Sequence, residues 1–313
     1  MPQADRKPLS SFWTPNYWPM WLAIGLLRLV ILLPHGFALS LGKALGRLAH
    51  GIGGKRRAIV RRNLALAFPE LSEAERNSLA RRHFESLGAS LIELGLARWS
   101  SDAWADRMTT IEGVEHLEKA VAEGRGVIFL SAHFTTLEFS GRKLKLNSPP
   151  FDLVYRAFRS GMSTEFIRTT RERSGRQTIE KNDIKRMVRS LREATPVWYA
   201  PDQSYRGKLA EVVPFFGVPC MANTATSSLA RLGKAVVLPY FPRRLENGRY
   251  HIAIWPPLEN FPSGDPIRDT EQYHEVLEKA IRLCPDQYYW VHRKYKNLPD
   301  GYPDYYADLD AWK

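Results

Sequence analysis

A histidine and a glutamate stand five positions apart in the stretch GVIFLSAHFTTLE, residues 126–138. The β-branched and aromatic run before His133 is typical of a buried strand, so we expect His133 in the loop where that strand ends. Five residues along one continuous helix correspond to about 140° of rotation, so His133 and Glu138 converge only if His133 precedes the next helix. A histidine can take a proton from a hydroxyl, and a nearby carboxylate stabilises the imidazolium that forms. His133 and Glu138 are therefore the candidate catalytic pair.

The same spacing also has an ordinary structural explanation. His133 would hydrogen-bond a loop carbonyl, and Glu138 would cap the helix that follows. H-x4-E is a short pattern, and by itself it does not distinguish this explanation from catalysis.

Polar residues at other strand ends favour a catalytic role for this region over a purely structural one, although each is also compatible with an ordinary strand-end charge. An arginine ends the run LVYR, and PDQ ends the run WYAPDQ. Guanidinium groups suit bidentate recognition of phosphate or carboxylate, and further arginines follow in the same region. A cationic pocket beside a histidine base suits an anionic substrate that carries a hydroxyl. The candidate substrate-binding residues are Arg156, Arg171, Arg173, Asp202 and Gln203.

Strand-like and helical segments alternate through the second half of the chain. The runs at 126–133, 151–156, 196–202, 235–242 and 251–257 are predicted strands, and helices are expected at 111–124, 163–173, 183–192, 224–232 and 271–284. Alternation of this kind predicts an α/β fold with a mostly parallel central sheet between two helical layers. Ligands of such sheets gather beyond the carboxyl ends of the strands, where the candidate residues stand. Residues 56–99 show helical periodicity, with a second helix starting at the capping box Ser72–Glu75.

The segment from Trp18 to Gly42 is almost continuously apolar and follows a cluster of tryptophan and tyrosine residues. Its length is compatible with a bilayer crossing, but Arg28 would be costly in hydrocarbon, so an interfacial helix remains an alternative. The segment lacks the form of a cleaved signal peptide. We expect residues 1–50 to form an N-terminal membrane anchor and residues 51–313 a catalytic domain.

The chain of 313 residues carries a formal net charge of +12, which favours anionic partners. Basic residues at 55–62 follow the apolar segment and predict a cytoplasmic orientation, although such a cluster can also be a solvated helix face. The chain has two cysteines, Cys220 and Cys284, which are too few for a disulfide framework, so we expect both to be buried thiols. The sequence has no P-loop, GxGxxG motif or clustered His/Cys set, so no metal or other cofactor is predicted.

Several long blocks together resemble the bacterial late acyltransferases of lipid A biosynthesis, of the lauroyltransferase type. The blocks are YWPMWLAIGLLRL, KRRAIVRRNLALAFPELSEAER, FESLGASLIELG, AHFTTLE, VYR, NDIKRMVRSLREATPVWYAPDQSY, VPFFGVP, ARLGKAVVLPYFPRR and PDQYYWVHRKYK. They cover nearly the whole chain after about residue 12. Two positions depart from the pattern: AFRSGM follows Arg156, where the family commonly has Asn and Pro residues, and Ser204 stands where it commonly has an acid.

The resemblance implies transfer of a fatty acyl group from acyl carrier protein to a hydroxyl of a 3-hydroxyacyl chain on a Kdo-bearing lipid A precursor. The reaction would take place at the cytoplasmic face of the inner membrane, without a cofactor. His133 and Glu138 match the family's catalytic positions, Arg156 and Asp202 match its second and third blocks, and Trp290 and Arg293 match its terminal W-x-H-R block.

The mechanism expected from this resemblance has His133 deprotonate the acceptor hydroxyl as it attacks the thioester, with Glu138 stabilising the protonated His133. Two alternatives stay open at this point. One is an acyltransferase with another lipid or glycolipid acceptor. The other is a basic membrane-bound protein that binds nucleic acid or anionic lipid without catalysis. The second is disfavoured because no RNA-stacking motif or helix-turn-helix pattern is present.

Overall fold

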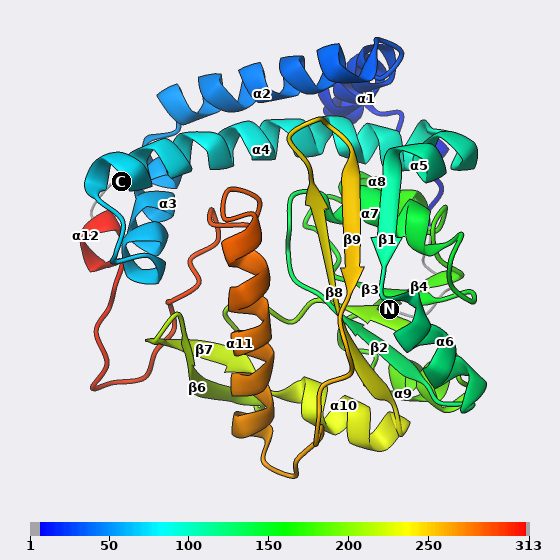
Figure 1. Cartoon of the computed structure of the whole chain (residues 1–313). Coiled ribbons are helices and arrows are strands. Elements are labelled where there is room, and N and C mark those ends of the chain that lie inside the picture. Colours follow the sequence, from blue (N-terminus) through cyan, green and yellow to red (C-terminus); the bar gives the residue numbers. More distant parts are fainter. Residues whose placement is uncertain (1–6, 311–313) are drawn as a thin grey trace.

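A computed structural model of the chain describes residues 7–310 (Figure 1). The N-terminal third is helical: short 3-10 turns at Leu9–Ser11 and Pro15–Tyr17 are followed by α1 (Trp18–Val30), α2 (His35–Ile52), α3 (Gly54–Ala67), α4 (Glu73–Trp99) and α5 (Asp102–Met108). The capping box predicted at Ser72 and Glu75 is present at the start of α4, where the Ser72 side chain accepts from the Glu75 amide and the Glu75 carboxylate accepts from the Ser72 amide.

The rest of the chain alternates strands and helices. These are β1 (Thr109–Glu112), α6 (Val114–Ala122), β2 (Val127–Leu130), α7 (Leu137–Leu144), β3 (Asp152–Tyr155), α8 (Gly161–Arg171), β4 (Gln177–Glu180), α9 (Ile184–Arg192), β5 (Val197–Tyr199), α10 (Ala225–Gly233), β8 (Val236–Arg244), β9 (Tyr250–Ile254), α11 (Pro266–Leu283) and α12 (Ala307–Asp310). A separate hairpin of β6 (Ala210–Phe215) and β7 (Val218–Asn223) precedes α10.

The main sheet has seven strands in the order β1-β9-β8-β2-β5-β3-β4. All its pairings are parallel except β8–β9, so the predicted mostly parallel sheet is confirmed. All four residues of β2 are buried. Ile128 and Leu130 belong to a core cluster shared with α11, whereas Val127 and Phe129 belong to a second cluster with α6. Since successive side chains of a strand point to opposite faces, both faces of the sheet are covered by helices.

The helix predicted to begin at residue 111 begins instead at Val114. Ile111 and Glu112 extend the edge strand β1, which pairs with β9, and Gly113 then turns the chain with a φ of 76°. The left-handed backbone favours glycine at this position, and a Cβ on Gly113 would lie 1.8 Å from the Ile254 carbonyl oxygen, so no larger residue fits.

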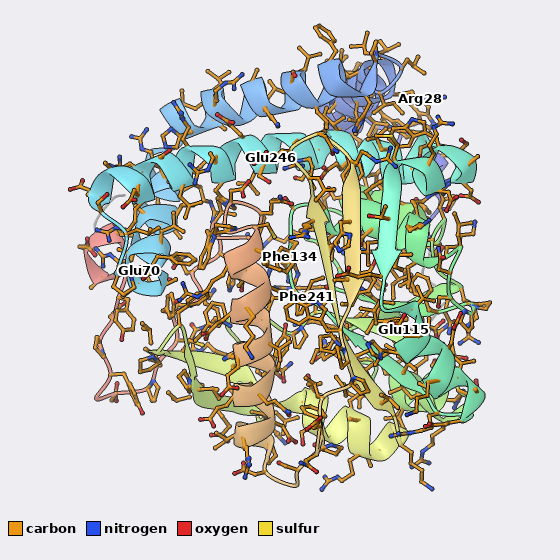
Figure 2. All side chains as sticks on the ribbon, viewed as in Figure 1. Arg28, Glu70, Glu115, Phe134, Phe241 and Glu246 are labelled. Atoms are coloured by element: carbon orange, nitrogen blue, oxygen red, sulfur yellow. The ribbon has the colours of Figure 1, made fainter. Side chains whose placement is uncertain are left out.

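α2 lies along α4 at one end of the molecule, as Figure 1 shows. Glycines allow the two helices to approach closely: a Cβ on Gly42 would lie 2.8 Å from the carbonyl oxygen of Gly88. No helix within residues 7–310 combines the length and apolarity that a bilayer crossing requires. Arg28, labelled on α1 in Figure 2, stacks over the ring of Trp99 at 5.6 Å.

Candidate active site

His133 lies in the loop between β2 and α7, as the sequence predicts. The Ser131 amide donates to the Tyr199 carbonyl at 2.8 Å, so the pairing of β2 with β5 continues one residue beyond the strand. Phe134 is buried against Phe241 and Tyr288, and Figure 2 shows Phe134 and Phe241 together in the interior. Because the residues on both sides are fixed, the loop presents the His133 side chain, 35% exposed, at the carboxyl edge of the sheet.

Asp202 is the carboxylate that contacts His133. Its Oδ1 lies 2.6 Å from Nδ1 of His133, and its Oδ2 accepts from the His133 backbone amide at 3.2 Å. Asp202 comes three residues after β5, the direct neighbour of β2, which explains why residues 69 apart meet. An ionised carboxylate only accepts hydrogen bonds, so Nδ1 carries a proton, and in the neutral imidazole Nε2 keeps its lone pair.

The charge of Asp202 is maintained in a fully buried position. Burial would raise the pKa of this carboxyl group, but the charge and hydrogen bonds of His133 and the charge of Lys294 together hold it below its ordinary value. The arrangement is a carboxylate–imidazole pair with one imidazole nitrogen directed away from its carboxylate. Such a pair is suited to general-base catalysis.

Glu138 does not take the position expected for it beside His133. In the first turn of α7, its two oxygens accept from Arg171 of α8, at 2.9 and 3.2 Å from Nε and 2.5 Å from an Nη. The predicted His133–Glu138 contact is therefore wrong. Glu138 on α7 contacts Arg171 of α8, and Asp202, in the loop after β5, occupies the position beside His133. The catalytic assignments of His133 and Glu138 stay predictions.

Arg171 has its partners within the chain. Besides binding Glu138, it donates to the Val154 carbonyl at 3.0 Å, and its guanidinium lies 5.9 Å from the Trp198 ring centroid. Burial would lower the pKa of Arg171, but the Glu138 carboxylate raises it overall. The pair joins α7, α8 and β3, and it leaves little of the Arg171 guanidinium for a substrate.

The remaining predicted binding residues fall in two places. Arg156 is exposed directly after β3, and Gln203 is half-buried beside Asp202, both at the carboxyl edge of the sheet. Arg173 is exposed beyond α8, where its charge acts on Arg98, Asp102 and Arg142. The substrate-binding roles of these residues stay predictions.

The C-terminal segment completes the site with residues that sequence reasoning did not single out. His292 accepts at Nε2 from the Ser204 amide at 3.1 Å, and the Ser204 hydroxyl donates to the Lys296 carbonyl at 3.0 Å. Burial, together with the charge of Lys296, lowers the pKa of His292 to about 3, so this histidine is neutral. The block WVHRKYK is the sequence signal that contains His292, Lys294 and Lys296.

Four cations gather beside this segment. Lys296 is partly buried, which lowers its pKa, and the charges of Arg293, Arg156 and Arg206 lower it further. Within residues 7–310 no ion pair links Arg156, Arg206 or Lys296 to a carboxylate. The charges of Arg156, Arg206 and Lys296 create a positive potential that favours an anionic ligand.

Comparison with known proteins identifies the family. Residues 6–297 match the model of the bacterial lipid A biosynthesis acyltransferases. The chain belongs to this family. It is an acyltransferase of lipid A biosynthesis, so the reading as a non-catalytic binding protein is wrong.

Individual relatives match this acyltransferase over nearly their full length. It is 37% identical to the lipid A biosynthesis lauroyltransferase of Escherichia coli K12, over 93% of the chain and 96% of the relative. It is 34% identical to the palmitoleoyltransferase of the same organism, over 93% and 95% of the two chains. It is 26% identical to the myristoyltransferase, over 100% and 96%. These relatives are named for three different acyl groups.

Proposed function

We propose that this acyltransferase moves a lauroyl-like fatty acyl chain from acyl carrier protein to a hydroxyl of a 3-hydroxyacyl chain on a Kdo-bearing lipid A precursor. The observation that carries the proposal is the His133–Asp202 pair at the carboxyl edge of the sheet, with Nε2 of His133 left as a base. The similarity to the lauroyltransferase supports the acyl group, while the palmitoleoyltransferase and myristoyltransferase are the competing precedents.

In the proposed mechanism, Nε2 of His133 takes the proton of the acceptor hydroxyl as its oxygen attacks the thioester carbonyl carbon. The new C–O bond forms, the C–S bond breaks, and the proton passes from His133 to the leaving thiolate. Asp202 holds the proton on Nδ1 and stabilises the imidazolium that forms during attack. Glu138 contributes by binding Arg171, which fixes the start of α7 against α8 and β3.

The cations near Lys296 support an acceptor that carries phosphate or sugar-acid groups. Arg156, Arg206 and Arg293 lie close enough for their charges to act on Lys296, and Lys296 follows His292 in the segment that borders the catalytic pair. Arginine binds phosphate and carboxylate bidentately, so these residues can hold the polar part of the acceptor while its acyl hydroxyl reaches His133. The same positive surface suits acyl carrier protein, which is acidic in general.

The outer faces of α1 and α2 support attachment to the inner membrane. Large apolar side chains are exposed along both helices: Trp18, Leu22, Leu26 and Leu29 on α1, and Phe37, Leu45, Leu48 and Ile52 on α2. On each helix these residues share one face, as in helices that lie in a membrane interface. Between α3, which follows α2, and the start of α4, a pocket of about 390 Å3 is lined by Arg57, Arg61, Arg62 and Arg76, with Glu73 as its one acidic group. Basic groups beside an apolar face attract anionic headgroups on the cytoplasmic side.

The membrane proposal is tested by vesicle flotation of the double variant Leu45→Glu/Leu48→Glu. We expect the variant to remain folded and to leave the vesicle fraction, because two carboxylates would have to enter the acyl region. Leu232→Glu, on α10 at the opposite end of the molecule from α2 (Figure 1), is the matched control and should float as the wild type does. Undiminished flotation of the double variant would contradict this placement.

The reaction is tested by mass spectrometry of purified protein with a panel of acyl carrier protein thioesters and the tetra-acylated Kdo-lipid A precursor. A mass gain of one acyl group should appear with the wild type and be lost in His133→Ala, since general-base catalysis contributes about 10² to 10⁴-fold. The donor that reacts fastest identifies the acyl chain. Full activity of His133→Ala would refute the mechanism, and transfer to another lipid alone would refute the acceptor.

A further inference from the structure

Lys294 is a buried charged residue that the proposed reaction does not use. Its side chain lies in the C-terminal segment and the residue is 2% exposed. Lysine is rarely buried to this extent unless its charge is paired. The ammonium nitrogen donates to the backbone carbonyl oxygen of Asp202 at 2.6 Å, which places a positive charge directly behind the residue that binds His133.

The other neighbours of Lys294 are suited to a cation. Nδ1 of His274 lies 2.7 Å from the Pro214 carbonyl, which can only accept, so Nδ1 carries the proton and Nε2 is an acceptor. The Lys294 ammonium lies 3.5 Å from that Nε2 and 4.4 Å from the centre of the Phe215 ring. A carbonyl oxygen, an imidazole lone pair and an aromatic face therefore surround the ammonium, and each of them is attractive to positive charge.

Asp202 is the buried negative charge that this ammonium balances. The titratable groups on which the charge of Lys294 acts come from the loop after β5, from β7, from α11 and from the C-terminal segment: Asp202, Cys220, His274, Glu278 and His292. Burial, with a smaller effect from Lys294, lowers the pKa of His274 to about 3, so His274 is neutral. Burial raises the pKa of Cys220, and Glu278, half-buried, is bound by the Phe216 amide.

We propose that Lys294 is a positioning residue for the His133–Asp202 pair. Its hydrogen bond holds the Asp202 backbone, and its charge keeps the Asp202 carboxylate ionised, so that His133 keeps its proton on Nδ1 and its lone pair on Nε2. The proposal rests on the proposed function, because it concerns how the base of that reaction is maintained. It assigns a role to a residue that does not touch the substrate.

Removing the positive charge should change the pH at which the pair becomes active. A nearby cation favours the deprotonated form of both members of the pair, so without it both bind protons more readily. The acid limb of the kcat/KM profile, which reports protonation of the base, should move to higher pH by about one unit, given the strength of charge interactions at such distances in a protein. A residue with only a structural role would lower the rate without moving this limb.

The experiment measures kcat/KM against pH for wild type, Lys294→Met, Lys294→Gln and Lys294→Arg in the full-length chain. Met and Gln should both move the acid limb upward, whereas Arg should keep it near the wild-type position. Gln keeps a hydrogen-bond donor for the Asp202 carbonyl, so it supplies the neutral variant if Met does not fold. Arg142→Gln is the matched control, since it removes another fully buried cation that contacts Ser100 and Asp102 rather than Asp202.

A second measurement tests the role of Lys294 independently of acyl transfer. The 15N signals of the His133 imidazole, followed by NMR through a pH titration, report its protonation and tautomer without substrate. In Lys294→Gln the midpoint should rise by about one unit, in parallel with the kinetic limb. Unchanged midpoints and limbs in folded neutral variants would overturn the role of Lys294. Absence of acyl transfer by the wild type would refute the proposed function, while the NMR result would still decide whether Lys294 acts on His133.

Discussion

Replacing Asp202 by Asn should remove the base while leaving the shape of the site intact. Asp202 accepts from both Nδ1 and the backbone amide of His133. An asparagine satisfies both contacts only if its oxygen accepts from the backbone amide and its NH2 group donates to Nδ1. Nδ1 must then be an acceptor, so the proton moves to Nε2, where the acceptor hydroxyl is to be deprotonated.

The expected loss is large. The same tautomer change in a Ser-His-Asp triad lowers kcat by about 10⁴-fold, and here too Asp202 is fully buried, so no solvent competes for its contacts. At 1.36 kcal/mol for each factor of ten, this loss corresponds to about 5 kcal/mol of transition-state stabilisation. The assay is single-turnover acyl transfer followed by mass spectrometry, at several pH values, on protein whose folding is verified by its melting temperature.

Glu138→Gln is the matched comparison. It also replaces one carboxylate by an amide, but the contacts it weakens are with Arg171. Loss of one partner of a largely buried ion pair costs about 3–5 kcal/mol of stability, so we expect a lower melting temperature and a rate loss within about 10-fold in the folded protein. If folded Glu138→Gln loses more activity than Asp202→Asn, Glu138 acts on His133 directly and the reasoning from the geometry fails.

Two further predictions concern stability. Burial lowers the pKa of His83 to about 4, below the 6.5 of an unfolded histidine. Between these values the unfolded chain binds more protons, so the free energy of unfolding should fall with decreasing pH, by up to about 1.4 kcal/mol per pH unit for this group. Denaturant titrations at pH 7 and 5 should show a smaller fall in His83→Gln than in the wild type, and an identical fall would contradict the assignment. Gly88→Ala should destabilise the protein by about 3 kcal/mol or more, because the new methyl group would overlap the Gly42 carbonyl where α2 packs against α4. Thermal unfolding measures this loss of stability. The control is Gly51→Ala, because Gly51 is exposed and a Cβ there would meet no other atom within 4 Å.

The sequence placed His133 correctly because a buried strand and its end are local features. Four consecutive buried residues lead to the His133 loop, and the pattern of β-branched and aromatic side chains is enough to predict this. The partner of His133 was not predictable from spacing, because Asp202 is 69 residues away and the contact depends on β2 and β5 being neighbours in the sheet. A spacing of five residues instead suggested Glu138.

Three strands outside the centre of the sheet were missed for a different reason. β4 has the sequence QTIE and lies at the edge of the sheet, and the β6–β7 hairpin carries a proline in each strand. β4 lacks the continuous apolar run that marked the central strands, and a proline within the apolar run of each hairpin strand argues against a strand. Lys294 was missed because a lysine in a basic segment gives no local sign that its side chain is buried.

The catalytic loop and the apolar outer helices are connected through α4. Thr135, two residues after His133, contacts the Ser86 hydroxyl of α4 at 2.9 Å, and Ser86 also accepts from Arg244 at 2.6 Å. Arg244, at the end of β8, forms a buried ion pair with Glu93, which lies two turns along α4 from Ser86. The opposite side of α4 packs against α2 through glycines. A single helix thus fixes the loop that carries the base and supports the layer proposed to meet the membrane, so the distance between His133 and the lipid surface is set by rigid packing.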